Sequence, residues 1–139
     1  MDYGEKIKWL KQYQCSLRRE NELVLEVERL HTEAEHITPL LSGMPGGGPN
    51  ADKLPCAVER IIEAQQKLSC QVNVCQAMRG RIVEMIDTVP NERQHEVLRR
   101  RYILGQRWER IAVEMNIEYK WVWKLHRRAI EGLTIKSDI

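Results

Sequence analysis

The chain has 139 residues, of which 42% are hydrophobic and 30% are charged, and its formal net charge at pH 7 is only +2. This length suits one domain, or a small domain with an accessory segment, and no apolar run approaches the roughly 18 residues of a membrane span. The first residues also lack the apolar region of a secretory signal. We therefore expect a cytoplasmic protein that has no membrane partner.

Positive charge is concentrated in the last third of the sequence. Residues 1–90 contain 11 Lys and Arg against 13 Asp and Glu, a net charge of −2, whereas residues 91–139 contain 11 against 7, a net charge of +4. A local excess of this kind can attract a polyanion, although ordinary solvated helices often carry a similar excess. The charge distribution alone therefore does not select a function.

Residues with reactive or metal-binding side chains form no recognisable catalytic pattern. The four cysteines, Cys15, Cys56, Cys70 and Cys75, form no C-x-x-C pair and have no histidines at zinc-site spacing. We expect four reduced thiols, with no metal and no cofactor. Because no Ser/His/Asp arrangement or pair of cleft carboxylates is indicated either, the sequence does not predict an enzyme.

Two long amphipathic helices are predicted in the first two thirds of the chain. In residues 5–37 and again in residues 53–89, apolar side chains recur at steps of three and four, which is the spacing of one helix face. Pro39 is expected to end the first helix and Pro90 the second. The Gly/Pro-rich segment of residues 38–52 is predicted to be the loop that connects them.

Folded back through this loop, the two helices would form a long antiparallel hairpin, with Asp52 as the N-cap of the second helix. Each helix has one apolar seam, which must be covered by the other helix, by a second copy, or by both. Gln65 and Arg79 interrupt the second seam, as polar residues that fix register or oligomeric state do; the alternative is that the seam is open to water there. We expect a homodimer through these N-terminal helices, as a four-helix bundle.

After Pro90 the pattern changes to three short helices. "NERQHEVLRRRYI" predicts the first, "RWERIAVEM" predicts the second, and the third is expected from Tyr119 to about Leu133. Gly105 suits a left-handed turn after the first helix, and Asn116 can adopt a positive φ after the second. Two short helices that are joined by a tight turn are typical of a helix-turn-helix.

The last predicted helix has an apolar side and a cationic side. At about 100° per residue, Leu125, Ala129 and Leu133 share the side of Val122, and Trp123 falls at the boundary. A helix with an exposed cationic side suits the major groove of DNA, where its N-terminal residues reach base edges. We expect base contacts or phosphate contacts from Arg107, Arg110, Glu118, Tyr119, Lys120, Trp121, Lys124, Arg127 and Arg128. The alternative for each charged residue is simple solvation.

The stretch "VLRRRYILGQRWERIAVEMNIEYKWVWKLHRRAIEGL" resembles the C-terminal DNA-binding region, region 4, of sigma-70-type factors. That pattern has L-x-x-R-Y, a glycine turn, E-I-A and a recognition helix that ends in A-L-x-x-L. The matching positions are Leu98, Arg101, Tyr102, Gly105, Ile111, Ala112, Val122, Ala129, Ile130 and Leu133. With "LSGMPGGGPNADKL" and the helix that follows, most of the chain is similar to phage- and prophage-encoded sigma-like regulators of the late-gene and autolysin type.

The resemblance implies a DNA-binding regulator that contacts promoter DNA or RNA polymerase. The chain departs from the family at the caps of both motif helices, where Arg107 and Glu118 stand in place of the usual Ser or Thr. It also has no counterpart of the sigma region that melts promoter DNA, so it should not act as a complete sigma factor.

The sequence therefore predicts an all-α protein with two regions. Residues 1–89 are expected to form a coiled-coil-like helical hairpin that dimerises, and residues 90–139 a sigma-region-4-like helix-turn-helix domain. The predicted function is sequence-specific binding of double-stranded DNA in phage transcription control. Two alternatives remain: a small-terminase-like protein that recognises phage DNA for packaging, and a protein-docking helical module without DNA binding.

Overall fold

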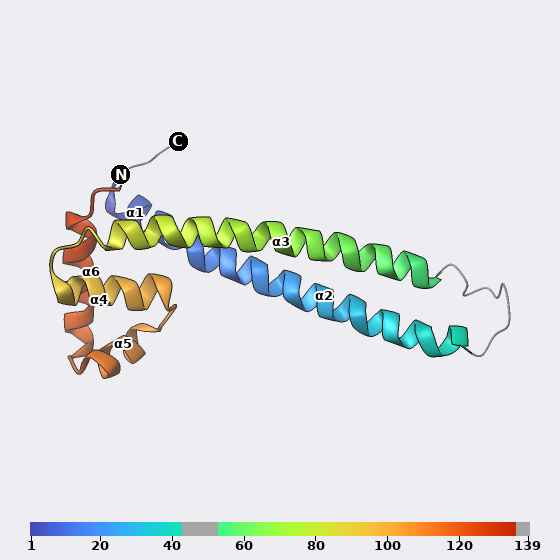
Figure 1. Ribbon diagram of the computed structural model, residues 1–139. Coiled ribbons are helices and arrows are strands. Elements are labelled where there is room, and N and C mark those ends of the chain that lie inside the picture. The colour runs from blue at the N-terminus through green and yellow to red at the C-terminus, as the bar shows by residue number, and fades with distance from the viewer. Residues whose placement is uncertain (43–52, 136–139) are drawn as a thin grey trace. The chain divides into compact units, whose positions relative to one another are not determined.

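The computed structural model describes residues 1–42 and 53–135 and, among them, all side chains except those of residues 38–42. Every regular element in these ranges is a helix, as the sequence predicted (Figure 1). None of the described helices combines the length and the apolar character that a bilayer span needs. The expected N-cap Asp52 and most of the expected loop lie outside the described residues.

The described elements follow one another along the chain as seven helical segments. They are α1 (Tyr3–Leu10), α2 (Gln12–Ser42), α3 (Lys53–Ile86), α4 (Glu92–Leu98), the π-helical turn η1 (Arg99–Ile103), α5 (Trp108–Met115) and α6 (Tyr119–Gly132). The chain divides into two compact units. We call residues 1–16 with 75–139 the terminal unit, and residues 17–74 the hairpin unit.

The first predicted helix differs from the observed one at both ends. Helix α1 begins at Tyr3 because Asp2 and Glu5 cap it reciprocally: the Glu5 backbone N–H donates to Asp2 Oδ1 at 2.8 Å, and the Asp2 N–H donates to Glu5 Oε2 at 3.1 Å. The helix is interrupted at Lys11, and the chain continues as α2. The expectation that Pro39 ends this helix is wrong, since α2 continues to Ser42. The fixed φ of proline is compatible with a helix, at the loss of one hydrogen bond.

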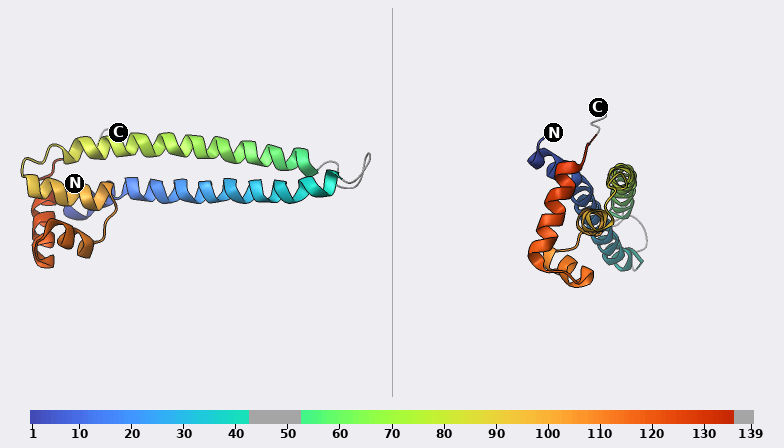
Figure 2. Two further views of the ribbon diagram at one scale, coloured as in Figure 1. Left: turned by 60° about the horizontal axis from the view of Figure 1, so that its bottom comes forward. Right: turned by 90° about the vertical axis from the view of Figure 1, so that its left-hand side faces the viewer.

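In the hairpin unit, α2 and α3 lie side by side in opposite directions, in the views of both Figure 1 and Figure 2. Their contact is formed by the buried side chains of Leu30, Ile61 and Ala64, with Val27 and Ala34 packed against them. Two other residues of α3, the apolar Val58 and the polar Gln65 of the predicted seam, are exposed. Within one chain, this contact therefore covers only part of the apolar surface of the two helices.

The terminal unit is built from both ends of the chain. Helix α6 packs against α1, α4 and α5, and a central cluster joins Val97, Ile111, Ala112 and Val122. The expected boundary after residue 89 differs from this division, because Trp9 and Leu10 are buried within the same unit as α6. The N-terminal residues therefore belong to the unit that was predicted to begin at residue 90.

Two polar side chains near the N-terminus bind backbone carbonyl groups of the C-terminal helices. Lys6 Nζ donates to the Ile130 carbonyl oxygen at 3.1 Å, in the last turn of α6, where helix carbonyls lack intrahelical partners. Gln14 Nε2 donates to the carbonyl oxygens of Tyr102 and Ile103, at 3.2 and 3.1 Å, at the end of η1. These bonds fix the N-terminal segment against the C-terminal helices.

Candidate nucleic-acid interface

Helices α5 and α6 are joined by a turn whose geometry agrees with the sequence prediction. Asn116 adopts φ 55° and ψ 47°, in the left-handed region, and the Ile117 N–H donates to the Ala112 carbonyl oxygen at 3.0 Å. Arg107 and Glu118 are the N-caps of α5 and α6, and neither side chain forms a capping hydrogen bond. Both helices therefore start without the side-chain cap that is usual at these positions.

Helix α6 has a buried side and a cationic exposed side. Val122, His126 and Ala129 are buried. At about 100° per residue, the exposed side chains Lys120, Trp121, Lys124 and Arg128 fall within an arc of about 100°. We call these four residues the cationic arc. It lies away from Val122 and the core cluster.

Two residues of the cationic arc contact each other directly. The Lys124 ammonium lies 4.7 Å from the centroid of the Trp121 ring, within the range of a cation–π interaction. Trp121 nevertheless remains 45% exposed, so its ring is available to a partner. Because Lys124 rests on this ring, the two side chains lose less rotational freedom when they bind a ligand.

Stacked aromatic rings support the two helices from the side. Trp108 of α5 and Trp123 of α6 have ring centroids 4.3 Å apart, and the Arg101 guanidinium lies 4.4 Å from the centroid of Trp108. Tyr119 contacts the edge of Trp123, with centroids 6.2 Å apart. Trp123 and Tyr119 are 41% and 45% exposed, which agrees with a boundary position. The stack restrains the angle between α5 and α6.

His126 lies on the buried side of α6 between two tyrosine hydroxyl groups. A hydrogen bond of 2.7 Å joins Nε2 to Tyr102 Oη, and one of 3.4 Å joins Nδ1 to Tyr3 Oη. Burial, together with the nearby positive charges of Arg101 and Lys11, lowers the pKa of His126 to about 4. The imidazole is therefore neutral at pH 7. One of its ring nitrogens donates and the other accepts, which the two hydroxyl groups can satisfy.

Two of the predicted DNA-contacting arginines already have acidic partners. Arg110 Nε donates to Glu114 Oε1 at 3.0 Å, and this bond lowers the pKa of Glu114. Arg127 Nε donates to Glu131 Oε1 at 3.1 Å. Both pairs are solvent-exposed, and exposed ion pairs contribute little to stability. Their ion pairs distinguish Arg110 and Arg127 from the residues of the cationic arc. Arg107 is exposed at the start of α5.

The "RRR" run at residues 99–101 contains distinctions that the sequence alone did not reveal. Arg100 pairs with Glu96 at 3.1 Å and also with Glu114, while Arg101 donates to the Gln106 carbonyl oxygen at 3.0 Å. Arg99 is exposed, and within the described part of the chain it has no ion-pair partner. The sequence could not show which of the three arginines has a partner. The partners of Arg100 and Arg101 depend on where α5 and Gln106 lie.

Within the described ranges, no group of three or more His, Cys, Asp or Glu side chains is placed to hold a metal ion. None of the four cysteines is part of a disulfide: Cys15, Cys56 and Cys70 are exposed, and Cys75 is buried. Comparisons with models of known protein families, with curated proteins and with solved structures found no match to this chain. The surface of α5 and α6 and the motif residues are therefore the features of this chain that point to a function.

Proposed function

We propose that the protein is a sequence-specific DNA-binding regulator of transcription, in which α5 and α6 act as a helix-turn-helix. The observation that carries the proposal is the cationic arc of α6, which is exposed on the side opposite the buried core residues of the same helix. The major groove is about 12 Å wide and admits one helix of this kind. The sequence resemblance to sigma region 4 supports the same assignment, for a phage-type, sigma-like regulator that acts in the cytoplasm.

Each residue of the arc has a chemical role that suits a duplex. Lys120 and Lys124 can donate to guanine O6 and N7, and the Trp121 ring can pack on a thymine methyl group. At the helix start, Glu118 can accept a hydrogen bond from cytosine N4, beside the exposed ring of Tyr119. Phosphate contacts are assigned to Arg107 and Arg128, with Arg110 and Arg127 exchanging their carboxylate partners for phosphates.

The neutral core behind α6 supports this role. The buried side of α6 carries an uncharged His126, and the ring of Trp123 on α6 stacks on Trp108 of α5. These contacts hold α6 in place. A rigid helix can read bases with a smaller loss of side-chain and backbone entropy than a mobile one. The α5–α6 surface would then present the arc in one orientation.

Selection of bound duplexes from a random pool, followed by affinity measurements at rising salt, tests the proposal. With about four phosphates contacted, the affinity should fall with a log–log slope of about −3.6, because each contact releases condensed counterions. One enriched sequence with such a slope is the expected result. Absence of duplex binding even at low salt would contradict the proposal.

A second candidate function, docking to a protein such as RNA polymerase, is favoured by two exposed apolar side chains. Val113 on α5 is 79% exposed, and Leu104 after η1 is 56% exposed. Neither is needed for phosphate contact, and both could be buried by a protein partner. Polymerase binding without duplex binding would favour this function. The remaining alternative, a packaging protein, predicts a ring of eight or more copies.

A further inference from the structure

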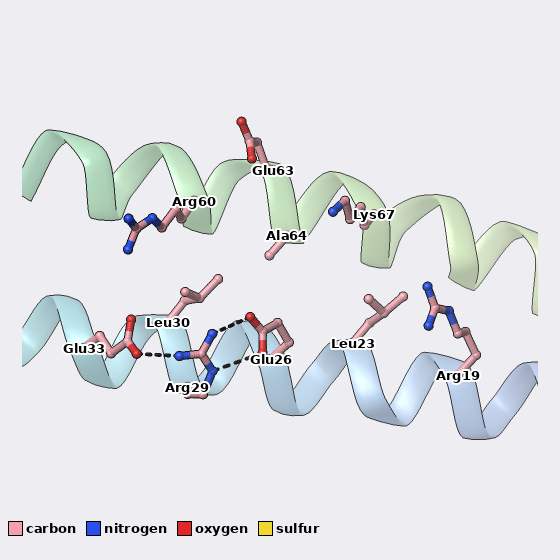
Figure 3. A pocket seen from close by; sticks show the side chains of 10 residues that line it. All are labelled: Arg19, Leu23, Glu26, Arg29, Leu30, Glu33, Arg60, Glu63, Ala64 and Lys67. Carbon is pink, nitrogen blue, oxygen red and sulfur yellow. Dashed lines mark hydrogen bonds and ion pairs between the residues drawn. The ribbon is translucent and has the colours of Figure 1, made fainter.

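Charged side chains of α2 in the hairpin unit form ion pairs within their own helix. Arg29 bonds to Glu26 at 2.6 Å and also to Glu33, along the wall of a groove between α2 and α3 with a volume of about 440 Å³ (Figure 3). These partners are three and four positions from Arg29, so the pairs stabilise α2 alone. They fix no part of the chain that is distant in the sequence.

Three polar side chains near the N-terminus form long-range contacts instead. Tyr3, Lys6 and Gln14 bind groups that lie at least 88 positions further along the chain. All of these groups belong to η1 or α6, in the same terminal unit. We call Tyr3, Lys6 and Gln14 the N-terminal clamp.

The spacing of the first two clamp residues explains why both reach α6. Tyr3 and Lys6 lie three positions apart, so they share one face of α1 with Leu10, within about 60°. Leu10 is completely buried, and α1 packs against α6. Lys8 is exposed and lies about 160° around the same helix from Lys6. The buried face of α1 therefore directs Tyr3 and Lys6, but not Lys8, toward α6.

Lys6 acts as a C-terminal cap for α6 that comes from another helix. Its ammonium donates to the carbonyl oxygens of Ile130 at 3.1 Å and Glu131 at 3.4 Å. The last carbonyl groups of a helix lack intrahelical donors and carry partial negative charge, so a cation is favourable there. Because Lys6 is half-buried, water screens these bonds less than it screens exposed ones. The end of α6 is therefore held by α1.

The other two clamp residues act on the turn before α5 and on the middle of α6. Gln14 Nε2 donates to the last carbonyl oxygens of η1, and its Oε1 lies 2.8 Å from where a Cβ atom on Gly105 would stand. Tyr3 Oη is 3.4 Å from His126 Nδ1 on the buried side of α6. The clamp therefore contacts the chain just before α5, the middle of α6 and the end of α6.

Reading base sequence requires that the cationic arc keep one orientation. The arc extends from Lys120 to Arg128, about 12 Å along the helix axis, so a tilt of about 5° shifts one end against the other by about 1 Å. Functional side chains must be held within about 0.5 Å of their productive positions. The N-caps of α5 and α6 contribute no side-chain hydrogen bond, so part of this restraint comes from contacts elsewhere in the terminal unit.

We propose that the N-terminal clamp positions the cationic arc for base contact, with Lys6 as the main positioning residue. The inference rests on the proposed DNA-binding function and adds three residues outside the helix-turn-helix that themselves contact neither base nor phosphate. When the clamp is undocked, α6 keeps its charge but loses its fixed tilt. Sequence-independent binding to phosphates then persists, whereas discrimination between base sequences falls.

Dissociation constants of the full chain for a selected and a random duplex, measured over a range of salt concentrations, test the proposal. Lys6→Met and Gln14→Met remove a donor and keep a side chain of similar length. Lys8→Met and Gln12→Met make the same replacements at exposed positions. Lys6→Met and Gln14→Met should each lower the ratio of the two affinities at least about 5-fold, because only molecules with a docked clamp read bases. The two control variants, and Lys6→Arg, which keeps a cationic donor, should keep the wild-type ratio.

The salt dependence separates positioning from direct contact. The log–log slope should be the same in Lys6→Met as in the wild type, because the phosphate contacts remain. A slope that is shallower by about 0.9, with equal losses of affinity on both duplexes, would make Lys6 a phosphate contact and would overturn the proposal.

Amide hydrogen exchange measures the clamp without DNA. The amides of α6 should exchange at least about 5-fold faster in Lys6→Met than in Lys8→Met, because the end of α6 opens more often. The amides of residues 53–74 in the hairpin unit should be unchanged. Equal exchange of α6 in the two variants would contradict the proposal.

The proposed function and the positioning role fail in different ways. A wild type with the same affinity for both duplexes would overturn the proposed function and the positioning role with it. A wild type that discriminates, together with Lys6→Met and Gln14→Met variants that discriminate equally well, would overturn the positioning role alone. If circular dichroism shows that Lys6→Met unfolds, Tyr3→Phe replaces it. That variant loses only the hydroxyl that contacts His126, and an unchanged affinity ratio would count against the clamp.

Discussion

His126 is an ionisable side chain in the core of the terminal unit, and its environment keeps it neutral. Its folded-state pKa is about 4, whereas an unfolded histidine titrates near about 6.5. Both states are neutral above pH 6.5, so the stability that this group confers is complete there. As the pH falls from 6.5 to 4, only the unfolded state gains the proton, and that stability is lost.

We predict that acid destabilises the terminal unit by up to about 3 kcal/mol between pH 6.5 and pH 4, from this residue alone. Urea unfolding followed by tryptophan fluorescence measures the loss, because Trp9, Trp108, Trp121 and Trp123 all lie in the terminal unit. His126→Gln keeps a hydrogen-bonding side chain that does not titrate. Its stability should change much less over the same range, and an equal loss in both proteins would show that other groups are responsible.

Gly105 is the residue at which the backbone after η1 requires the absence of a side chain. Its φ is +68°, and a Cβ atom there would lie 2.8 Å from Gln14 Oε1. Gly105→Ala should lower the free energy of unfolding by about 1–2 kcal/mol for the left-handed conformation alone, with a further loss as Gln14 is displaced from the η1 carbonyl groups.

Gly80 provides the matched control for Gly105 in the same unit. It lies in α3, and a Cβ atom there would meet nothing within 4 Å. Gly80→Ala should raise the stability by about 0.5–1 kcal/mol, as expected in an exposed helix. Urea unfolding of both variants checks the opposite signs, and a neutral Gly105→Ala would contradict the assigned role of the turn.

At the scale of elements, the sequence pattern did not predict which helices α1 packs against. Leu10, Tyr13 and Leu17 keep the three-and-four spacing of the α2 seam, so the pattern could not show that their partners change along the chain. The structure buries Leu10 and Tyr13 in the terminal unit. One periodicity serves two different partners, and only the tertiary packing distinguishes them.

The turns before and after α5 were predictable because they depend on local backbone chemistry. Gly105 and Asn116 both adopt the positive φ that their residue types permit. The π-helical form of η1 was not predictable, since its last carbonyl groups are satisfied by Gln14, which is far away in the sequence. Local signals therefore located the turns, whereas the partner of the η1 carbonyl groups lies far away along the chain.

The packing of α1 gives a prediction at this scale. Leu10 is completely buried, so Leu10→Ala should destabilise the terminal unit by about 2–5 kcal/mol. Leu25→Ala, at a position that is 64% exposed in the hairpin unit, should change the stability by less than about 0.5 kcal/mol. Tryptophan fluorescence during urea unfolding measures both. If Leu10→Ala left this signal unchanged, α1 would not be part of the unit that contains α6.

For the whole molecule, the sequence predicted an all-helical chain with two parts, and the helical character is confirmed. The dividing line was not predictable, because the terminal unit combines residues 1–16 with residues 75–139. The spacing of hydrophobic residues identified the helices. It did not identify which other helix covers the apolar seam of each one. The predicted DNA contacts stay a prediction, and they rest on the exposure of the cationic arc.

The central claim is that the cationic arc of α6 reads base sequence, and one binding measurement tests it most directly. Dissociation constants are measured for the selected duplex and for a random duplex of equal length, with the wild type, Trp121→Ala, Lys124→Ala and a control, Lys53→Ala. The control removes the same charge as Lys124→Ala, from an exposed position in the hairpin unit.

We predict that Trp121→Ala and Lys124→Ala each weaken binding of the selected duplex by about 1–3 kcal/mol, or roughly 5- to 150-fold, because base contacts are lost. Both should affect the random duplex much less, and Lys53→Ala should leave the ratio of the two affinities unchanged. Equal losses on the selected and the random duplex, or no loss on either, would contradict the account.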